Sequence, residues 1–282
     1  MTRPIAGLRE IADRYDGFIV DLWGVMHDGV QAFPAAVDCL RKLKARGSRI
    51  AILSNAPRRS ASATERSAAI GVTPDLYNAM ITSGEDCWQR LAAGAPGRRA
   101  LFIRAGWDNQ YLDGLDIEPV DDPARADFAL VLGVDNDTET LDPLAPTLRA
   151  ARDRDLLMIC ANPDLIVMHG GAMRLCAGAV AQRYEALGGR TEYHGKPHAP
   201  VYARAFDALG VDPSRILAIG DSLRTDITGA RGVGIASLFV ADGIHREELV
   251  GPLGGDLEPA HVAERLSKNV PAPDWVASRL SW

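Results

Sequence analysis

Residues 18–29 are FIVDLWGVMHDG, and this stretch decides which fold is expected for the whole chain. The apolar run Phe18–Val20 contains β-branched residues and predicts a buried strand. Asp21 follows directly, where a parallel strand passes into a loop. In open α/β sheets, binding and catalytic residues lie at such strand ends. An acidic residue in this place can be a nucleophile, a metal ligand or the cap of the next element. The stretch therefore predicts an α/β sheet with a candidate functional carboxylate at its edge.

The bulk composition is that of a globular protein with a moderate excess of acidic residues. The chain has 282 residues, 47% hydrophobic content and a formal net charge of −6. This charge argues against nucleic acid and anionic membrane surfaces as partners. No run of about 18 apolar residues predicts a membrane span, and the N-terminus lacks the apolar region of a signal peptide. Four cysteines without a CxxC pair indicate reduced thiols, so we expect a cytoplasmic protein.

The pattern of the first strand, an apolar run that ends in polar residues, recurs along the chain. Residues 49–53 predict a strand that ends at Ser54 and Asn55. Residues 215–219 predict another strand, which ends at Asp221 after a single glycine. Apolar residues at helical spacing predict intervening helices over 35–46, 61–70, 83–91 and 199–209. The chain therefore alternates strands and helices, as parallel sheets require.

A second series of strands and helices is inserted between these elements. Residues 94–97 (GAPG) break the chain, and residues 100–187 again alternate predicted strands with predicted helices. The pair Gly188-Gly189 closes the series, and we expect residues 192–194 to return to the first sheet. The predicted domains are a core of residues 1–93 and 190–282 and an inserted domain of residues 94–189.

The polar residues at the strand ends suit phosphoryl transfer. Parallel topology brings the carboxyl ends of neighbouring strands to one edge, where Asp21, Ser54, Lys196 and Asp221 can converge. An ionised aspartate can attack phosphorus, a hydroxyl and an ammonium group can hold phosphate oxygens, and carboxylates are ligands of Mg²⁺. These residue types together predict a site that binds phosphate and a divalent metal.

Four motifs in order make the chain resemble the haloacid dehalogenase (HAD) superfamily, subfamily IIA, which includes NagD-like nucleotidases and pyridoxal phosphate phosphatases. The motifs are DLWGV at 21–25, LSN at 53–55, GKP at 195–197 and GDSLRTD at 220–226. The resemblance covers nearly the whole chain. It implies a Rossmann-like HAD core with a parallel sheet, an inserted α/β cap of the C2 type that includes NPD at 162–164, and a homodimer formed through the cap.

The resemblance also implies an activity and a role for each matched residue. The activity is Mg²⁺-dependent hydrolysis of a small phosphorylated metabolite through an aspartyl phosphate on Asp21. The implied catalytic residues are Asp21 and Lys196. Phosphate or substrate contacts are implied for Ser54, Asn55, Lys196, Asn162 and Arg174, with Asp164 and His169 as further candidates in the cap. The implied metal ligands are Asp21, the carbonyl of Trp23, Asp221 and Asp226.

One position departs from the family pattern. Phosphatases of the superfamily usually carry a second Asp two residues after the nucleophile, which protonates the leaving oxygen and then activates water, and here this residue is Trp23. General acid–base help is typically worth about 10²–10⁴-fold in rate. His27 or a group of the substrate is a candidate substitute for the acid, with a structural role of His27 as the alternative.

Three functions therefore stay open. The first is the phosphatase, and the second is a module that binds a phosphorylated metabolite without turning it over. The third is a hydrolase of another bond, such as a dehalogenase, because dehalogenases of the superfamily have an aromatic residue at the position of Trp23. Against the third stands the pair Asp221 and Asp226, since dehalogenases work without a metal.

Overall fold

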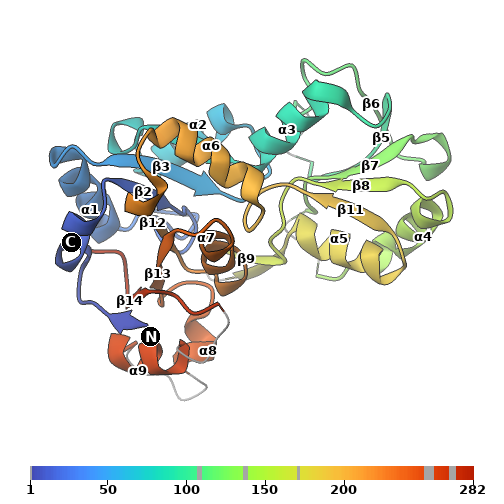
Figure 1. Cartoon of the computed structure of the whole chain (residues 1–282). Coiled ribbons are helices and arrows are strands. Elements are labelled where there is room, and N and C mark those ends of the chain that lie inside the picture. Colours follow the sequence, from blue (N-terminus) through green and yellow to red (C-terminus); the bar gives the residue numbers. More distant parts are fainter. Residues whose placement is uncertain (1, 107–109, 136–138, 170–171, 251–256, 267–270) are drawn as a thin grey trace.

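The computed structural model describes residues 2–106, 110–135, 139–169, 172–250, 257–266 and 271–282. Two sheets lie side by side in the molecule, and helices flank each of them (Figure 1). Every strand pair in both sheets is parallel. The predicted α/β class, with a Rossmann-like parallel core and an inserted α/β domain, is therefore confirmed.

The first sheet has seven strands, and the strand of the opening stretch lies inside it. Its order is β1 (Arg3–Pro4), β14 (Trp275–Ala277), β13 (Ala236–Val240), β12 (Ile216–Gly220), β2 (Gly17–Val20), β3 (Arg49–Ser54) and β4 (Ala79–Thr82). The predicted strands at 18–20, 49–53 and 215–219 each agree with the structure to within one residue. Because β12 and β3 flank β2, the polar residues that follow these three strands meet at one edge.

Both faces of this sheet are buried, which explains the continuous apolar run in β2. Phe18 and Val20 pack on one face with α1 (Pro34–Ala45), and Ile19 packs on the other face with α6 (Ala199–Leu209). The other helices along this part of the chain are α2 (Ser60–Ala69), α3 (Ser83–Gly94), α7 (Thr228–Gly232), α8 (Arg246–Val250) and α9 (Pro259–Leu266).

The second sheet has five strands and belongs to the inserted segment. Its order is β11 (Arg190–Tyr193), β8 (Leu157–Cys160), β7 (Phe128–Val131), β5 (Arg99–Ile103) and β6 (Glu118–Val120). On one face it packs against α4 (Ala145–Asp153) and α5 (Ala177–Ala186). On the other face it contacts α3 through Cys87 and Leu91. We call this second sheet, together with α4, α5 and the chain between β8 and α5, the cap.

The expected return of residues 192–194 to the first sheet is wrong. β11 pairs with β8 in the second sheet, and Glu192 lies opposite Ile159. The glycine pair that suggested a domain end instead ends α5, because Gly188 has a φ of 89°, a left-handed conformation common after helices. The boundaries at 94 and 189 stay a prediction, although α3 and β11 extend the packing of the second sheet beyond both of them.

A β-hairpin of the cap lies between the two sheets, and the sequence pattern did not predict it. It consists of β9 (Ile166–His169) and β10 (Ala172–Leu175), which pair antiparallel with Val167 opposite Arg174. Each strand has four residues, too few for the alternation of side chains to stand out. In Figure 1 the hairpin reaches from the cap toward the core near α7.

Two expectations about the chain as a whole can be compared with the structure. All four cysteines are buried and unpaired, as predicted for reduced thiols. Among the described helices, none combines the length and the apolar character that a membrane crossing would require.

Candidate active site

Asp21 and Lys196 form a buried ion pair at the end of β2. The Lys196 Nζ donates to Asp21 Oδ1 at 2.6 Å and to Asp226 Oδ1 at 2.7 Å. Lys196 is 3% exposed and Asp21 is 8% exposed, so this pairing is largely shielded from water. Burial disfavours the ammonium charge, but the two carboxylates outweigh burial and the net effect is to raise the pKa of Lys196. Lys196 is therefore a fixed positive charge beside the predicted nucleophile.

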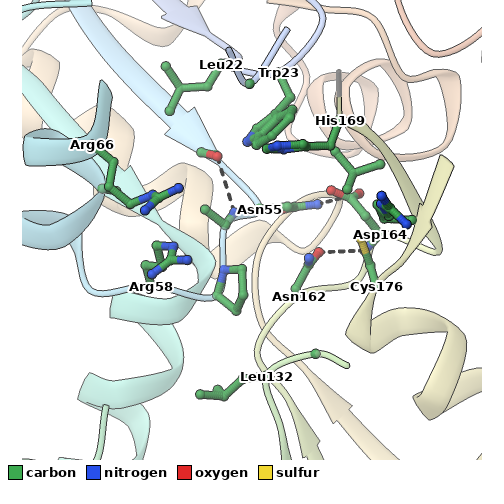
Figure 2. A pocket seen from close by; sticks show the side chains of 18 of the residues that line it. Leu22, Trp23, Asn55, Arg58, Arg66, Leu132, Asn162, Asp164, His169 and Cys176 are labelled. Carbon is green, nitrogen blue, oxygen red and sulfur yellow. Dashed lines mark hydrogen bonds between the residues drawn. The ribbon is translucent and has the colours of Figure 1, made fainter. Parts of the chain in front are cut away.

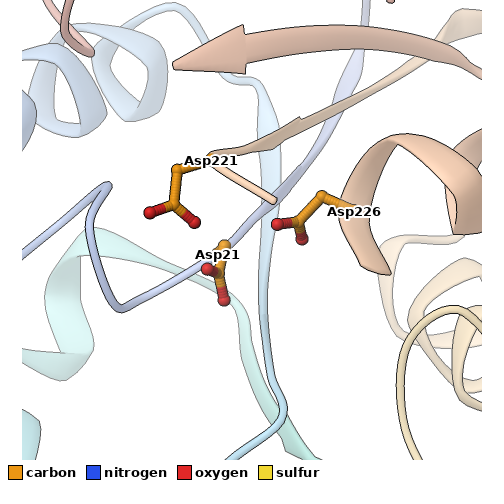
Figure 3. A group of neighbouring side chains, drawn as sticks. All are labelled: Asp21, Asp221 and Asp226. Atoms are coloured by element: carbon orange, nitrogen blue, oxygen red, sulfur yellow. The ribbon is translucent and has the colours of Figure 1, made fainter. Parts of the chain in front are cut away.

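Three aspartates converge at this point, as Figure 3 shows. One carboxylate oxygen from each of Asp21, Asp221 and Asp226 lies within 4.8 Å of the others. Burial raises the pKa of all three carboxyl groups, and repulsion by its two neighbours raises the pKa of Asp221 further. Lys196 offsets only part of this effect at Asp21 and Asp226. The cluster therefore has an excess of buried negative charge.

The cluster fits a divalent cation. Carboxylate oxygens are hard ligands of the kind that Mg²⁺ binds, and a divalent cation would offset the burial of the three carboxylate charges and the repulsion at Asp221. Asp21, Asp221 and Asp226 are three of the metal ligands implied by the family resemblance, and the structure places them close together while their metal binding stays a prediction. The carbonyl of Trp23 stays a predicted ligand.

Two glycines leave the space that the Asp221 carboxylate occupies. A Cβ on Gly24 would lie 2.0 Å from Asp221 Oδ2, and a Cβ on Gly243 would lie 2.1 Å from the same atom. The backbone N–H of Ile244 donates to this oxygen at 2.7 Å. Gly24 also has a φ of 72°, which L residues with a side chain rarely adopt. The glycine after Trp23 is therefore required by the packing of Asp221.

The amide of Asn55 positions the backbone of Lys196. Its Oδ1 accepts from the backbone N–H of Lys196 at 2.8 Å, and its Nδ2 donates to the Lys196 carbonyl at 3.1 Å and to Asp164 Oδ1 at 2.9 Å. Both amide hydrogens are used by these two bonds. A Cβ on Gly195 would lie 2.5 Å from Asn55 Oδ1, which explains the glycine before Lys196. Asn55 therefore has a positioning role in this structure, and its phosphate contact stays a prediction.

A pocket of about 340 Å³ opens between the core and the cap at Asp21 (Figure 2). Of the residues predicted to contact phosphate or substrate, Ser54, Asn55, Asn162 and Arg174 line it. Asp221, Asp226 and Lys196 do not line the pocket and lie behind Asp21. The Ser54 Oγ accepts from the backbone N–H of Ala56 at 3.2 Å, so its own O–H is a donor for a ligand. The predicted residues thus form two layers, one that lines the pocket and one behind Asp21.

The Trp23 indole occupies the wall of this pocket. Its ring centroid lies 4.9 Å from that of His27 and 5.6 Å from that of His169. A Cβ on Gly29 would lie 2.3 Å from the indole, so this glycine makes room for it. Burial lowers the pKa of His27 to about 4, and its Nδ1 accepts from the backbone N–H of Gly29. His27 is therefore neutral at physiological pH and packs against Trp23.

The sequence interpretation missed two arginines of the pocket, Arg58 and Arg66. Arg58 follows β3, and Arg66 lies on α2. The available signal was helical spacing, because Ala63, Arg66, Ser67 and Ile70 recur on one face of α2 and all line the pocket. The sequence alone did not show that the cap lies opposite this face of the helix.

Comparison with known proteins agrees with this geometry. The family model "Haloacid dehalogenase-like hydrolase" matches residues 18–118, and the model "HAD-hydrolase-like" matches residues 193–269. A crystal structure of a haloacid dehalogenase-like hydrolase from Brucella suis is 34% identical, covers 98% of this chain and 99% of its own, and superposes with a TM-score of 0.85.

Two further relatives are phosphatases by name. D-glycerol 3-phosphate phosphatase from Mycobacterium tuberculosis is 28% identical over 95% of this chain and 77% of its own length. A crystal structure of glycerol phosphate phosphatase from the same organism, in complex with magnesium, is 23% identical, covers 94% of this chain and 75% of that chain, and has a TM-score of 0.69, which shows a shared fold. The resemblance drawn from the four motifs is confirmed, and the chain belongs to the haloacid dehalogenase-like hydrolase family.

Proposed function

We propose that this protein is a Mg²⁺-dependent phosphatase of a small phosphorylated metabolite. The observation that carries the proposal is the position of Asp21, between the Lys196 ammonium and two further buried carboxylates, at the wall of the pocket under the cap. The glycerol 3-phosphate phosphatase among the relatives supports the reaction class. The proposed intermediate is an aspartyl phosphate on Asp21.

The residues around Asp21 divide the work of phosphoryl transfer. Lys196 binds Asp21 Oδ1, which leaves Oδ2 to attack phosphorus and points the carboxylate in one direction. The Ser54 hydroxyl holds a phosphoryl oxygen as negative charge develops on it, and the Lys196 ammonium behind Asp21 stabilises the same charge electrostatically. A divalent metal bound by Asp21, Asp221 and Asp226 would neutralise the phosphate charge and hold it against the nucleophile. Because the site is buried, these charges act with little screening.

Departure of the alcohol is the step for which this site is poorly equipped. The indole of Trp23 lies where the family pattern places a carboxyl group, and indole has no acid chemistry near neutral pH. The leaving oxygen must therefore depart with less help than in other family members. We expect the rate to depend steeply on the pKa of the leaving alcohol.

A dehalogenase is the weaker alternative. It agrees with an aromatic residue at position 23, but it gives no role to Asp221 and Asp226. Burying two additional carboxylates is unfavourable unless a cation compensates them. A metal-dependent reaction gives that burial a function.

Removal of metal tests the proposal directly. After dialysis against EDTA, release of p-nitrophenol from p-nitrophenyl phosphate is expected to fall by about 10³-fold and to return when Mg²⁺ is added, because a bound cation supplies several kcal/mol of charge stabilisation. The Asp21→Asn variant provides the background rate. As a matched control, Asp75→Asn removes an exposed carboxylate that does not line the pocket and should leave the rate unchanged.

Two results would contradict the proposal. The first is phosphate release that does not exceed the Asp21→Asn background in the presence of Mg²⁺ across a panel of phosphorylated metabolites. The second is release that EDTA leaves unchanged. Chloride release from a haloacid under the same conditions would favour the dehalogenase instead.

A further inference from the structure

Three arginines line the pocket in addition to the residues proposed for catalysis. Arg58 and Arg66 come from the core, and Arg174 comes from the cap. In Figure 2, Arg58 and Arg66 are drawn on the same side of the pocket, opposite Asn162 and Asp164. A pocket with cationic side chains on both walls is suited to an anionic ligand.

The fold aims Arg66 at the pocket. The residues of α2 that line the pocket follow the spacing i, i+3, i+4 and i+7, which defines one helix face, and Arg66 lies in the middle of it. The chain before α2 is held as well, because the Thr82 hydroxyl donates to the Arg58 carbonyl at 2.7 Å. A Cβ on Gly84 would lie 2.5 Å from the same carbonyl oxygen, so the two segments pack without a gap.

The hairpin of the cap aims Arg174 at the same pocket. Val167 and His169 are two residues apart in β9, so their side chains lie on the same face. Arg174 lies opposite Val167 in the register, so its side chain shares that face. All three line the pocket, whereas Met173 on the other face is 62% exposed. The Nε of Arg174 is buried and has no hydrogen-bond partner among the described residues. A buried donor without an acceptor is unfavourable, and a ligand oxygen would satisfy it.

The guanidinium charges of Arg66 and Arg174 differ from that of Arg59 in whether a carboxylate compensates them. Neither side chain makes an ion pair with any carboxylate of the described residues. By contrast Arg59, which precedes α2 and does not line the pocket, binds both carboxylate oxygens of Glu85. Arg66 and Arg174 thus differ from this structural neighbour in having charge to offer a ligand.

The scissile phosphate does not account for this charge. In the proposed mechanism, the divalent metal and the Ser54 hydroxyl hold the transferred phosphoryl group at Asp21, so this group does not need the three arginines. The arginines line the remaining wall of a pocket that is larger than a phosphate group requires. A second negative group on the substrate would balance them.

We propose that Arg66 and Arg174, with Arg58 beside them, bind a second anionic group of the substrate, so that the protein acts on phosphate monoesters that also carry a carboxylate or a second phosphate. This inference rests on the proposed phosphatase function. Guanidinium groups match both kinds of anion in geometry, because each presents paired N–H donors to paired oxygens.

Three substrates with the same leaving alkoxide chain test the inference. They are propyl phosphate, 3-(phosphonooxy)propanoate and propane-1,3-diyl bisphosphate, which differ only in the group at the far end. The expected kcat/KM is about 10-fold or more higher for a substrate with a second anionic group than for propyl phosphate, because a charged hydrogen-bonded pair is gained. The carboxylate and bisphosphate arms show which second anion the pocket prefers.

Substitution of the arginines separates this role from a role in holding the scissile phosphate. Arg66→Gln and Arg174→Gln are each expected to lower kcat/KM for the preferred substrate with a second anionic group by about 10- to 100-fold. Both should change propyl phosphate and p-nitrophenyl phosphate by less than about threefold. Arg183→Gln, an exposed arginine of α5 outside the pocket, serves as the matched control and should change none of them.

Three outcomes would overturn the inference. The first is an equal loss for substrates with and without the second anionic group in the arginine variants, which would place the arginines at the scissile phosphate. The second is no preference for either substrate with a second anionic group while p-nitrophenyl phosphate is still hydrolysed, which leaves the phosphatase proposal intact. If no substrate is hydrolysed, that proposal fails, and calorimetric binding of 3-(phosphonooxy)propanoate and the bisphosphate decides instead. The third outcome is then equal affinity of the wild type and both arginine variants for these two compounds.

Discussion

The Trp23→Asp variant is expected to hydrolyse propyl phosphate about 100-fold faster than the wild type. The substitution supplies a carboxyl group two residues after the nucleophile, where it can protonate the leaving oxygen and then take a proton from water, and such help is worth about 10²–10⁴-fold. p-Nitrophenolate leaves without a proton, so p-nitrophenyl phosphate should change by less than about threefold. The measurement is the slope of log kcat against leaving-group pKa, which should become shallower in the variant.

Trp23→Asn is the matched control for this comparison. It has the shape of the aspartate variant without an acid, and both variants remove the indole that contacts His27 and His169. Structural effects of losing the indole therefore cancel between them. Equal rates for the two variants would mean that another group already protonates the leaving oxygen.

The Lys196→Met variant is expected to lose both activity and stability. Its free energy of unfolding in EDTA should be lower by about 3–5 kcal/mol, because removal of one partner leaves Asp21 and Asp226 as uncompensated buried charges. Urea unfolding gives this free energy. Hydrolysis of p-nitrophenyl phosphate should fall by about 10³-fold, since the variant loses the fixed positive charge that orients the nucleophile.

The stability loss should depend on pH. Burial raises the pKa of Asp21 and Asp226, so their protonated forms are tolerated in the folded protein and their ionised forms are not. The stability contributed by such groups is fully present below their unfolded pKa of 3.8 and is lost as pH rises through the folded pKa. The deficit of Lys196→Met should therefore be larger at pH 8 than at pH 5, and Mg²⁺ should recover part of it at pH 8.

Lys42→Met is the control, because Lys42 lies on the surface of α1 with its side chain 47% exposed and pairs with Asp38. Its loss should change the free energy of unfolding by less than about 0.5 kcal/mol. If Lys196→Met were no more destabilised than Lys42→Met, the buried lysine would not be needed to compensate the carboxylates.

The elements that the sequence predicted well are those with local signals. The strands before Asp21, Ser54 and Asp221 are apolar because both faces of their sheet are buried, and their ends carry the motifs. Parallel topology then places these ends together without further information. The aspartate cluster with Lys196 could thus be predicted from spacing, strand ends and family resemblance.

The parts that could not be predicted depend on contacts between distant segments. No local pattern tells whether β11 joins one sheet or the other, because both offer an apolar edge to a short strand. The roles of Arg66 and Arg174 depend on a helix of the core facing a hairpin of the cap across the pocket. Asn55 lies within a motif, yet its use as a clamp on Lys196 follows only from the hydrogen bonds of the folded chain.

Asn55 has a consequence for how far this protein can be divided into modules. Its single amide joins the core strand β3, the Asp164 turn of the cap and the backbone of Lys196. Excising the cap would therefore not yield a smaller enzyme with an open site. The excision would remove Asp164, which helps to orient the Asn55 amide, and this amide holds the backbone of Lys196. Cap and core are a single cooperative unit at this residue, and substitutions on either side of it are expected to be non-additive.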